Sequence, residues 1–255
     1  MTPVRDNDDG LGLRPLTARS IVASTLLGMR PPELSAQLLV RSGELFGIAE
    51  GTTRTALSRM LNAGELVAVD GRYRLAGHLL DRQARQDASR HPRLRARWDG
   101  QWRSAVVVAE RRSASERTAL RTAMTRARYG ELREGVWLRP HNLAEGPPDV
   151  DGVTWLGARP DDPRAVTRRL WDLAAWADRA ERLRRAMTPS VDESDLAHAF
   201  EVSAAVLRHL QSDPLLPDQL LPSRWPGDAL REEYERFDTD FKTTWRAWFR
   251  RYRHA

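Results

Sequence analysis

The hydrophobic positions of residues 17–62 recur at helical spacing and predict consecutive helices. Thr17 can cap the first helix and Ser35 the second, which is expected to run to Phe46. The pair Pro31-Pro32 separates these two helices. The inner face of a third helix follows an i, i+3, i+4, i+7, i+8 pattern, formed by Thr53, Ala56, Leu57, Met60 and Leu61.

A β-hairpin is predicted directly after the third helix. Gly64 is placed to end that helix as a C′ glycine. Two short segments follow, and Asp70-Gly71 between them is a type I′ turn signal. Strand alternation puts Arg72 and Arg74 on one face of the hairpin. Helices followed by a basic hairpin predict a winged helix-turn-helix, a DNA-binding module.

The polar face of the third helix has the composition of a surface that contacts DNA bases. Thr52, Arg54, Thr55, Ser58 and Arg59 combine short hydrogen-bonding side chains with arginines, which fits a major groove. A solvated helix face has a similar composition, and the hairpin that follows favours DNA over that simpler interpretation. Thr53 lies on the apolar stripe, where packing is its simpler role.

The middle of the chain alternates strand and helix patterns. Residues 102–109, 135–139 and 153–158 predict strands, and residues 115–129 predict a helix between the first two. One long helix is expected over about residues 163–187. This order suggests a ferredoxin-like α+β sandwich whose last strand is not identified in the sequence.

The pattern becomes helical again from Val191, with a proline-rich loop over residues 213–227. The predicted fold class is therefore α+β. The expected parts are a disordered tail at 1–15, the winged helix-turn-helix at 16–77, a connector at 78–97, the ferredoxin-like domain at 98–187 and a helical C-terminal domain at 188–255.

The composition fits a polyanionic partner and narrows the chemistry. The 255 residues carry a net charge of +6, and Lys242 is the only lysine among 41 basic residues. The absence of cysteine excludes disulfides, thiolate catalysis and cysteine-bound zinc. No apolar run is long enough to span a membrane and the N-terminus lacks a signal-peptide core, so a cytoplasmic protein without membrane partners is expected.

Enzyme and metal-site motifs are not found in the sequence. It contains no HExxH, GxSxG, GxxxxGK[ST] or GxGxxG motif, so no catalytic residue and no cofactor are expected. His198, Glu201 and His209 lie near one face of one predicted helix. His198 and His209 are, however, about 16 Å apart along the axis, too far for one ion, and no metal site is expected.

Aromatic and basic residues of the middle region invite a ligand-binding interpretation. Packing is the simpler role for the tryptophans, since each buries a large area. We expect the following to be core residues: Trp98, Trp102, Trp137 and Trp171. Arg103 and Arg139 could meet a phosphate, but we expect both to be exposed strand residues.

Five short motifs, in order, carry a resemblance to a known family. They are residues 47–75, Trp98–Trp102 (WDGQW), Gly135–Pro140 (GVWLRP), Trp171–Leu173 (WDL) and Asp213–Gly227 (DPLLP, LLP and WPG). With these motifs the chain resembles the PaaX family of bacterial transcriptional repressors, which control phenylacetate catabolism and related pathways.

The resemblance implies a homodimer that binds a double-stranded, pseudo-palindromic DNA operator. It also implies that a small-molecule effector, an aryl-acetyl-CoA thioester, releases the repressor from DNA. The effector-binding residues stay unknown, because no motif fixes the pocket. DNA reading is assigned to Thr52, Thr53, Arg54, Thr55, Ser58 and Arg59, and backbone contact to Arg72 and Arg74.

Two alternatives stay open beside a DNA-binding regulator. The small nuclease of CRISPR adaptation resembles the family's central domain and needs an acidic residue at the end of its first strand, where this chain has Glu110. A metal-dependent nuclease is therefore one alternative, although Arg111 and Arg112 make Glu110 typical of a turn. The other is a protein-interaction module whose winged helix binds a partner protein instead of DNA.

Overall fold

The computed structural model describes residues 11–13, 16–95, 97–108 and 112–251. The chain forms two compact units, and each unit draws on separate segments. The first unit comprises Met1–Asp87, Glu181–Arg208 and Ala229–Ala255, and the second comprises Ala88–Ala180 and His209–Asp228. The domain boundaries expected from the sequence stay a prediction.

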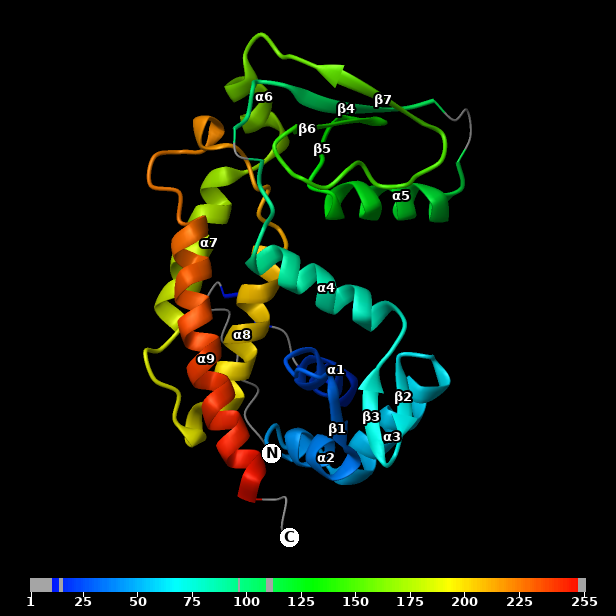
Figure 1. The fold of residues 1–255 in the computed structure, drawn as a ribbon, viewed down its shortest axis with the longest axis vertical. Helices are drawn as coiled ribbons and strands as arrows, with labels where there is room; N and C mark the ends of the chain where they lie inside the picture. The colour runs from blue at the N-terminus through cyan, green and yellow to red at the C-terminus, as the bar shows by residue number, and fades with distance from the viewer. Residues whose placement is uncertain (1–10, 14–15, 96, 109–111, 252–255) are drawn as a thin grey trace. The chain divides into compact units, whose positions relative to one another are not determined.

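The first unit begins with the predicted helices (Figure 1). Helix α1 spans Ala18–Leu27, and Thr17 and Ser20 form a reciprocal capping box at its start. Helix α2 spans Ala36–Glu44, and the Ser35 hydroxyl accepts a hydrogen bond from the backbone N–H of Leu38. Both predicted caps are confirmed, but α2 ends at Glu44 rather than at Phe46.

Helix α3 and a small sheet complete this part of the unit. Helix α3 spans Glu50–Asn62 and packs on α1 and α2. It is followed by strands β2 (Leu66–Val69) and β3 (Arg72–Leu75). Their turn has φ values of 50° at Asp70 and 70° at Gly71, as the predicted hairpin requires. The sheet gains a short strand that the sequence pattern did not reveal, β1 (Glu33–Ser35), which pairs with β3.

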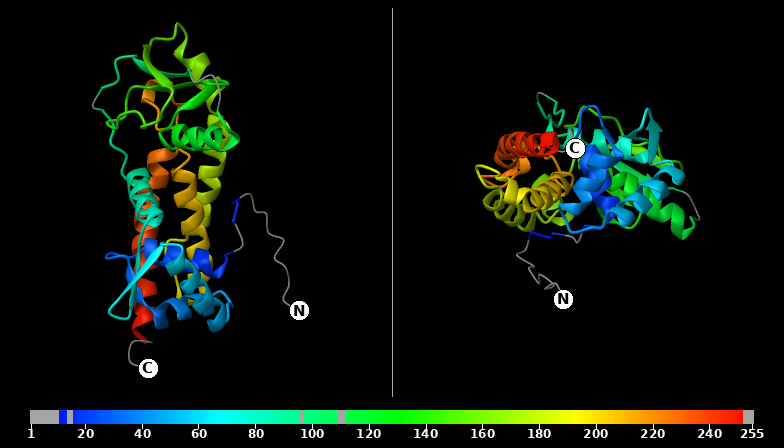
Figure 2. Two further views of the ribbon diagram at one scale, coloured as in Figure 1. Left: turned by 90° about the vertical axis from the view of Figure 1, so that its right-hand side faces the viewer. Right: turned by 90° about the horizontal axis from the view of Figure 1, so that it is seen from below.

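The remaining elements of the first unit are helical. Helix α4 (His78–Arg90) follows the hairpin, and the later helices are α8 (Leu196–Leu210) and α9 (Gly227–Arg251). Helix α7 (Leu173–Ala186) joins this unit only from Glu181 onward, because its residues 173–180 belong to the second unit. Within the first unit, α8 and α9 lie side by side (Figure 2). The Phe200 and Trp245 rings stack with centroids 5.5 Å apart, and the Ser203 and Tyr234 hydroxyls lie 3.0 Å apart.

The second unit is built on a four-stranded antiparallel sheet. Its elements are β4 (Trp102–Val107), α5 (Ala114–Arg126), β5 (Gly130–Arg133), β6 (Val136–Pro140) and β7 (Val153–Ala158), with the strand order β5-β6-β4-β7. This is the strand order of a ferredoxin-like sandwich, so the α+β fold class is confirmed. The strand that the sequence pattern did not identify is β5, which precedes β6, so the expectation that the last strand is the missing one is wrong. The described residues 141–152 between β6 and β7 form no helix.

The long helix expected over residues 163–187 is wrong, because the structure breaks it at Trp171. Helix α6 spans Pro163–Leu170, and Trp171 then takes an extended backbone conformation. Its ring stacks on Trp102 with centroids 6.4 Å apart. The Asp172 carboxylate accepts a hydrogen bond from the backbone N–H of Ala175 at 2.9 Å and so caps the start of α7. The break in a sequence that otherwise has helical spacing thus coincides with the packing of the partly buried Trp171 ring against Trp102.

The predicted core tryptophans do pack in the second unit. Trp102 forms a cluster with Leu138, Leu173, Leu216 and Leu220, against which Trp98 and Trp171 pack. Trp137 belongs to a second cluster. The family motifs identified in the sequence thus supply much of the core of this unit.

The expectation that Arg139 is exposed is wrong. Only 2% of Arg139 is exposed, whereas Arg103 is partly buried. The Arg139 guanidinium donates to the backbone oxygen of Glu145 at 2.8 Å and lies 5.0 Å above the Tyr129 ring. A carbonyl and an aromatic face therefore stabilise this buried cation, which the strand pattern alone cannot reveal.

Candidate nucleic-acid interface

The outer face of α3 presents a continuous polar surface. Its inner side buries Ala56, Leu57 and Met60 against the rest of the first unit. The predicted DNA-reading residues on the opposite side are exposed, namely Thr52, Arg54, Thr55, Ser58 and Arg59. One helix thus brings these five side chains together on one surface.

Thr53 is the exception among the predicted DNA-reading residues. It is fully buried, at 0% exposure, and a Cβ atom at position 43 would overlap its hydroxyl. Gly43 of α2 therefore allows α3 to approach closely. Because Thr53 packs inside the unit, its side chain is not part of the exposed surface of α3.

The two arginines of α3 differ in their partners. The Arg54 Nε lies 2.6 Å from a carboxylate oxygen of Glu50, one turn earlier. The Arg59 side chain forms neither a hydrogen bond nor an ion pair with any described residue. Its guanidinium therefore has all its donors available for a partner outside the chain.

The start of α3 carries no side-chain cap. Ala49 is the N-cap residue, and the backbone N–H of Thr52 bonds to the carbonyl oxygen of Ala49 at 3.0 Å. Glu50 is the acidic residue of the first turn. The polar face thus begins within the first turn of the helix, where Thr52 already bonds to the backbone of Ala49.

The hairpin arginines share one carboxylate that the sequence analysis did not identify. The strand register puts Arg72 and Arg74 on the same face, as predicted. Glu33 of β1 pairs with both: its carboxylate lies 2.7 Å from the Arg74 Nη2 and 3.2 Å from the Arg72 Nε. The Arg74 hydrogen bond is the main cause that lowers the pKa of Glu33. Glu33 stands far from both in sequence, so only the β1–β3 pairing reveals it.

A second carboxylate fixes the base of the hairpin. The Glu65 side chain is 8% exposed and lies 3.6 Å from the His78 Nε2. It also accepts a hydrogen bond from the Arg19 Nε at 2.9 Å, and this bond is the main cause that lowers the pKa of Glu65. Glu65 therefore connects the hairpin to α1 and α4.

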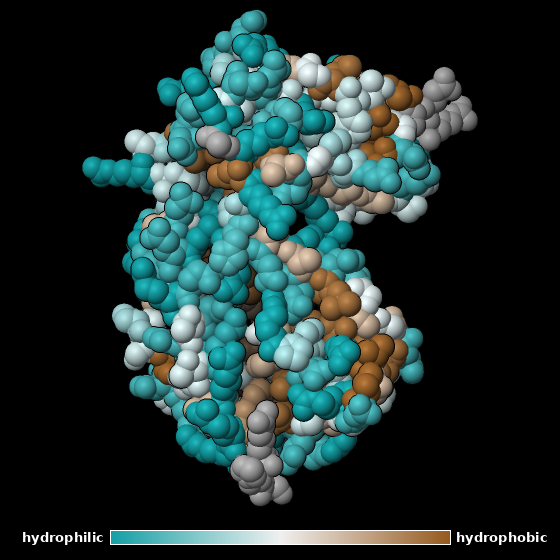
Figure 3. Space-filling model, viewed as in Figure 1, coloured by the Kyte–Doolittle hydropathy of each residue, from teal (hydrophilic) through white to brown (hydrophobic). Residues whose placement is uncertain are grey.

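Exposed apolar side chains lie beside this basic surface. Val67 and Val69 of β2 are each 43% exposed, and Leu80 of α4 is 45% exposed. Hydrophobic residues are visible on the side of the first unit that carries α4 and β2 (Figure 3). The register places Val67 opposite Arg74 and Val69 opposite Arg72. The exposed face of the hairpin is therefore both cationic and apolar.

The described residues contain no group of three side chains placed to hold a metal ion. The His209 ring stacks on Trp176 with centroids 4.3 Å apart, and its Nε2 lies 3.0 Å from the Trp176 carbonyl oxygen, so packing accounts for this histidine. Glu110 lies outside the described residues. None of the described helices combines the length and the apolar character needed to cross a bilayer.

The comparisons with known proteins agree along most of the chain. The family described as PaaX-like protein matches residues 17–79, the PaaX protein central Cas2-like domain matches residues 95–149, and the PaaX-like protein C-terminal domain matches residues 171–251. No curated protein matches significantly.

A solved structure supports the same grouping. The uncharacterized protein Rv0674 from Mycobacterium tuberculosis is 43% identical to this chain, with a TM-score of 0.73. The match covers 91% of this chain and 99% of that chain. On this evidence the chain belongs to the PaaX family.

Proposed function

We propose that this chain is a sequence-specific, double-stranded DNA-binding transcriptional regulator that acts in the cytoplasm as a repressor and is not an enzyme. The observation that carries the proposal is the exposed polar face of α3, next to a hairpin with two arginines. Family membership supports a PaaX-like regulator. Such a surface suits a groove lined by base edges and phosphates.

In this proposal α3 enters the major groove and the hairpin contacts the DNA backbone. Thr52, Arg54, Thr55, Ser58 and Arg59 face the base edges. Arg72 and Arg74 contact phosphates and exchange part of their pairing with Glu33 for those contacts. Arg59 is the leading candidate for base recognition, since no described residue occupies its donors.

The proposed regulator acts as a homodimer on a pseudo-palindromic operator. Its two reading helices contact half-sites about 34 Å apart, one helical turn of DNA. An aryl-acetyl-CoA thioester binds the arrangement of the dimer that cannot engage both half-sites, and it shifts the population toward that arrangement. Repression is thereby relieved without any change in the α3 residues themselves.

Fluorescence anisotropy of a labelled duplex from the upstream region of the gene tests DNA recognition, with a scrambled duplex as its control. Arg59→Ala is expected to weaken specific binding by about 1–3 kcal/mol and to reduce the preference over the scrambled duplex. Arg168→Ala removes an exposed arginine from α6 and serves as the matched control. Equal effects of the two variants would exclude Arg59 from base recognition.

The apolar residues of the hairpin favour a second candidate function. Val67, Val69 and Leu80 give the winged helix a surface that could bind a partner protein. Salt separates the two candidates, because DNA binding releases counterions and weakens steeply as salt rises. Partner binding that is insensitive to salt, without affinity for duplex DNA, would support the protein-interaction module.

A further inference from the structure

The first unit contains a cavity of about 300 Å³ where the hairpin approaches the C-terminal part of α9. One wall consists of Arg30 and Glu33, and Arg72 of the hairpin lines it as well. Helix α9 contributes Arg246, Phe249 and Arg250. Four arginines and one glutamate therefore line a small cavity. Among these arginines, only Arg72 belongs to the proposed DNA contacts.

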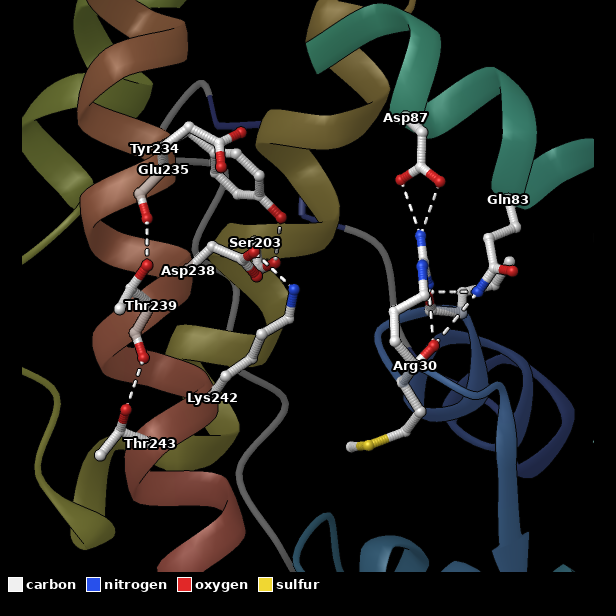
Figure 4. A network of polar contacts seen from close by, with 12 residues as sticks. Arg30, Gln83, Asp87, Ser203, Tyr234, Glu235, Asp238, Thr239, Lys242 and Thr243 are labelled. Carbon is white, nitrogen blue, oxygen red and sulfur yellow. Dashed lines mark hydrogen bonds and ion pairs between the residues drawn. The ribbon is translucent and has the colours of Figure 1, made fainter. Parts of the chain in front are cut away.

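Two of these arginines are already held by acidic groups of the chain. The Arg30 guanidinium lies 2.7 Å from both carboxylate oxygens of Asp87, as Figure 4 shows. Arg72 shares the carboxylate of Glu33 with Arg74. Their positive charges are therefore balanced in part within the unit.

The two α9 arginines are different. Arg246 and Arg250 are exposed, and neither guanidinium group forms a hydrogen bond or an ion pair with any described residue. Other cations of the same helix are paired: Lys242 lies 2.6 Å from Asp238, and Arg251 contacts Glu193. Like charges four residues apart on a helix repel each other, and an anion between them relieves that repulsion.

The cavity also has an apolar side. Phe249 lies between the two α9 arginines in sequence and is itself 5% exposed, and Leu34 also lines the cavity. A volume of about 300 Å³ is at the lower end of small-molecule sites. Its size and lining fit a small anion with an apolar body.

We propose that this cavity binds a small organic oxyanion, with a carboxylate or phosphate-ester head and an aromatic or aliphatic body. Arg246 and Arg250 hold the head, because guanidinium groups bind both kinds of oxyanion with paired hydrogen bonds. Arg72 contacts the same ligand from the hairpin, and the apolar body lies toward Phe249 and Leu34.

The position of Arg72 couples this site to DNA binding, a consequence that rests on the proposed function. A ligand that binds Arg72 in the cavity competes with the DNA phosphates for the same guanidinium. Occupation of the site therefore lowers DNA affinity, and by linkage DNA lowers the affinity for the ligand by the same factor.

Isothermal titration calorimetry of the full-length protein with phenyl phosphate, without DNA, tests the site. We expect saturable binding of one molecule per chain. Arg246→Gln and Arg250→Gln are each expected to weaken it at least about tenfold, as expected for loss of a charge-assisted hydrogen bond. Arg236→Gln removes an exposed arginine of α9 outside the cavity and should leave the affinity unchanged.

Two further ligands identify the head group and the role of the apolar body. Benzoate in place of phenyl phosphate separates a carboxylate site from a phosphate-ester site, and the tighter ligand identifies the preferred head. Inorganic phosphate lacks the apolar body and is expected to bind more weakly than phenyl phosphate.

The proposal is overturned if neither organic anion binds saturably, or if the affinity is the same in both cavity variants and the wild type. In the second case the anion binds elsewhere. The proposal is also overturned if the variants keep the calorimetric affinity of the wild type and weaken only DNA binding in the anisotropy assay. Arg246 and Arg250 would then contact the DNA backbone. Because the calorimetry contains no DNA, its failure leaves the proposed DNA recognition to be judged by anisotropy alone.

Discussion

At the scale of single residues, Gly43 and Thr53 control how closely α2 and α3 pack. No side chain larger than hydrogen fits at position 43, because a Cβ would overlap the Thr53 hydroxyl. The sequence pattern correctly put Thr53 on the apolar stripe, but its resemblance-based role in DNA reading conflicts with its burial. Burial depends on a glycine in another helix, which periodicity within one helix does not report.

Gly43→Ala is expected to destabilise the first unit by about 1–3 kcal/mol, the usual cost of overpacking a filled interior. Urea unfolding followed by circular dichroism measures the change. Gly51→Ala is the matched control, since no atom lies within 4 Å of a Cβ at this exposed helical position. The control variant should be as stable as the wild type or more stable. If the Gly43 variant matches it, α2 and α3 can separate at little cost.

Glu65 makes stability depend on pH. Its pKa is lowered in the folded state by the Arg19 hydrogen bond, so its contribution is present above the unfolded-state pKa of about 4.5 and is lost as the pH falls through the lower folded-state value. Glu65→Gln should lower the free energy of unfolding by about 1–2 kcal/mol at pH 7. The loss is no larger because Arg19 is half exposed and solvent screens the ion pair.

The measurement is chemical unfolding of both proteins at pH 7 and at about pH 4. We expect the difference between wild type and variant to shrink at the lower pH. A difference that stays constant with pH would show that Glu65 stabilises the hairpin through packing rather than through its charge.

At the scale of elements, the β1–β3 pairing determines the charge of the hairpin. Because Glu33 forms ion pairs with both Arg72 and Arg74, the hairpin presents less unpaired positive charge than its sequence suggests. We expect Glu33→Gln to increase affinity for duplex DNA of any sequence and to steepen its salt dependence.

Anisotropy on the operator and on the scrambled duplex, over a salt series, measures this effect. A gain confined to the operator would contradict a purely electrostatic role for Glu33. A loss of affinity on both duplexes would show that the pairs position the arginines for contact rather than competing with it.

The elements that could be predicted are those specified by local chemistry. Thr17, Ser35 and Asp70-Gly71 mark their helix starts and their turn through bonds and dihedral angles of neighbouring residues. The sequence pattern did not reveal strands β1 and β5 because each is short and is held by pairing with another strand. Strand β1 pairs with β3, which is distant in sequence, and β5 pairs with β6. The break at Trp171 was not revealed because it coincides with a tertiary contact, the packing of this ring against Trp102.

The start of α7 illustrates how a tertiary contact and a local signal combine. Asp172→Ala removes the carboxylate that caps the helix after the break, and we expect a loss of about 1 kcal/mol in unfolding free energy. Asp161→Ala removes an exposed aspartate in the same region and is the control. Thermal unfolding of the two variants compares them, and equal midpoints would show that packing of Trp171 is sufficient to start α7.

At the scale of the whole molecule, the sequence predicted the α+β class but not the assembly of the elements into two units. Four of the five motifs that carry the family resemblance contribute residues to one core cluster of the second unit, whereas residues 47–75 belong to the first unit. The anion cavity was not predictable, because it joins residues 30 and 72 to residues 246–250. Such sites arise from contacts between distant segments.

The proposed homodimer is a prediction at this scale. Sedimentation of the free protein should give twice the chain mass of 29.0 kDa, and one dimer should bind one operator. A single half-site duplex is the control and should bind far more weakly, because it engages only one reading helix. Equal affinity for half and full sites would contradict dimeric recognition.

The division of the chain has a consequence for its synthesis. Helix α3 comes early in the chain, yet its unit also includes residues 181–208 and 229–251. The ring centroids of Phe46 and Phe200 lie 5.1 Å apart within that unit. A ribosome therefore releases the helix long before the segments that complete its unit. During translation the nascent chain exposes the Phe46 ring until Phe200 of α8 has been synthesised and can pack against it. Messages cut short before α9 would yield a reading helix whose own unit is unfinished, a substrate for chaperones and proteases.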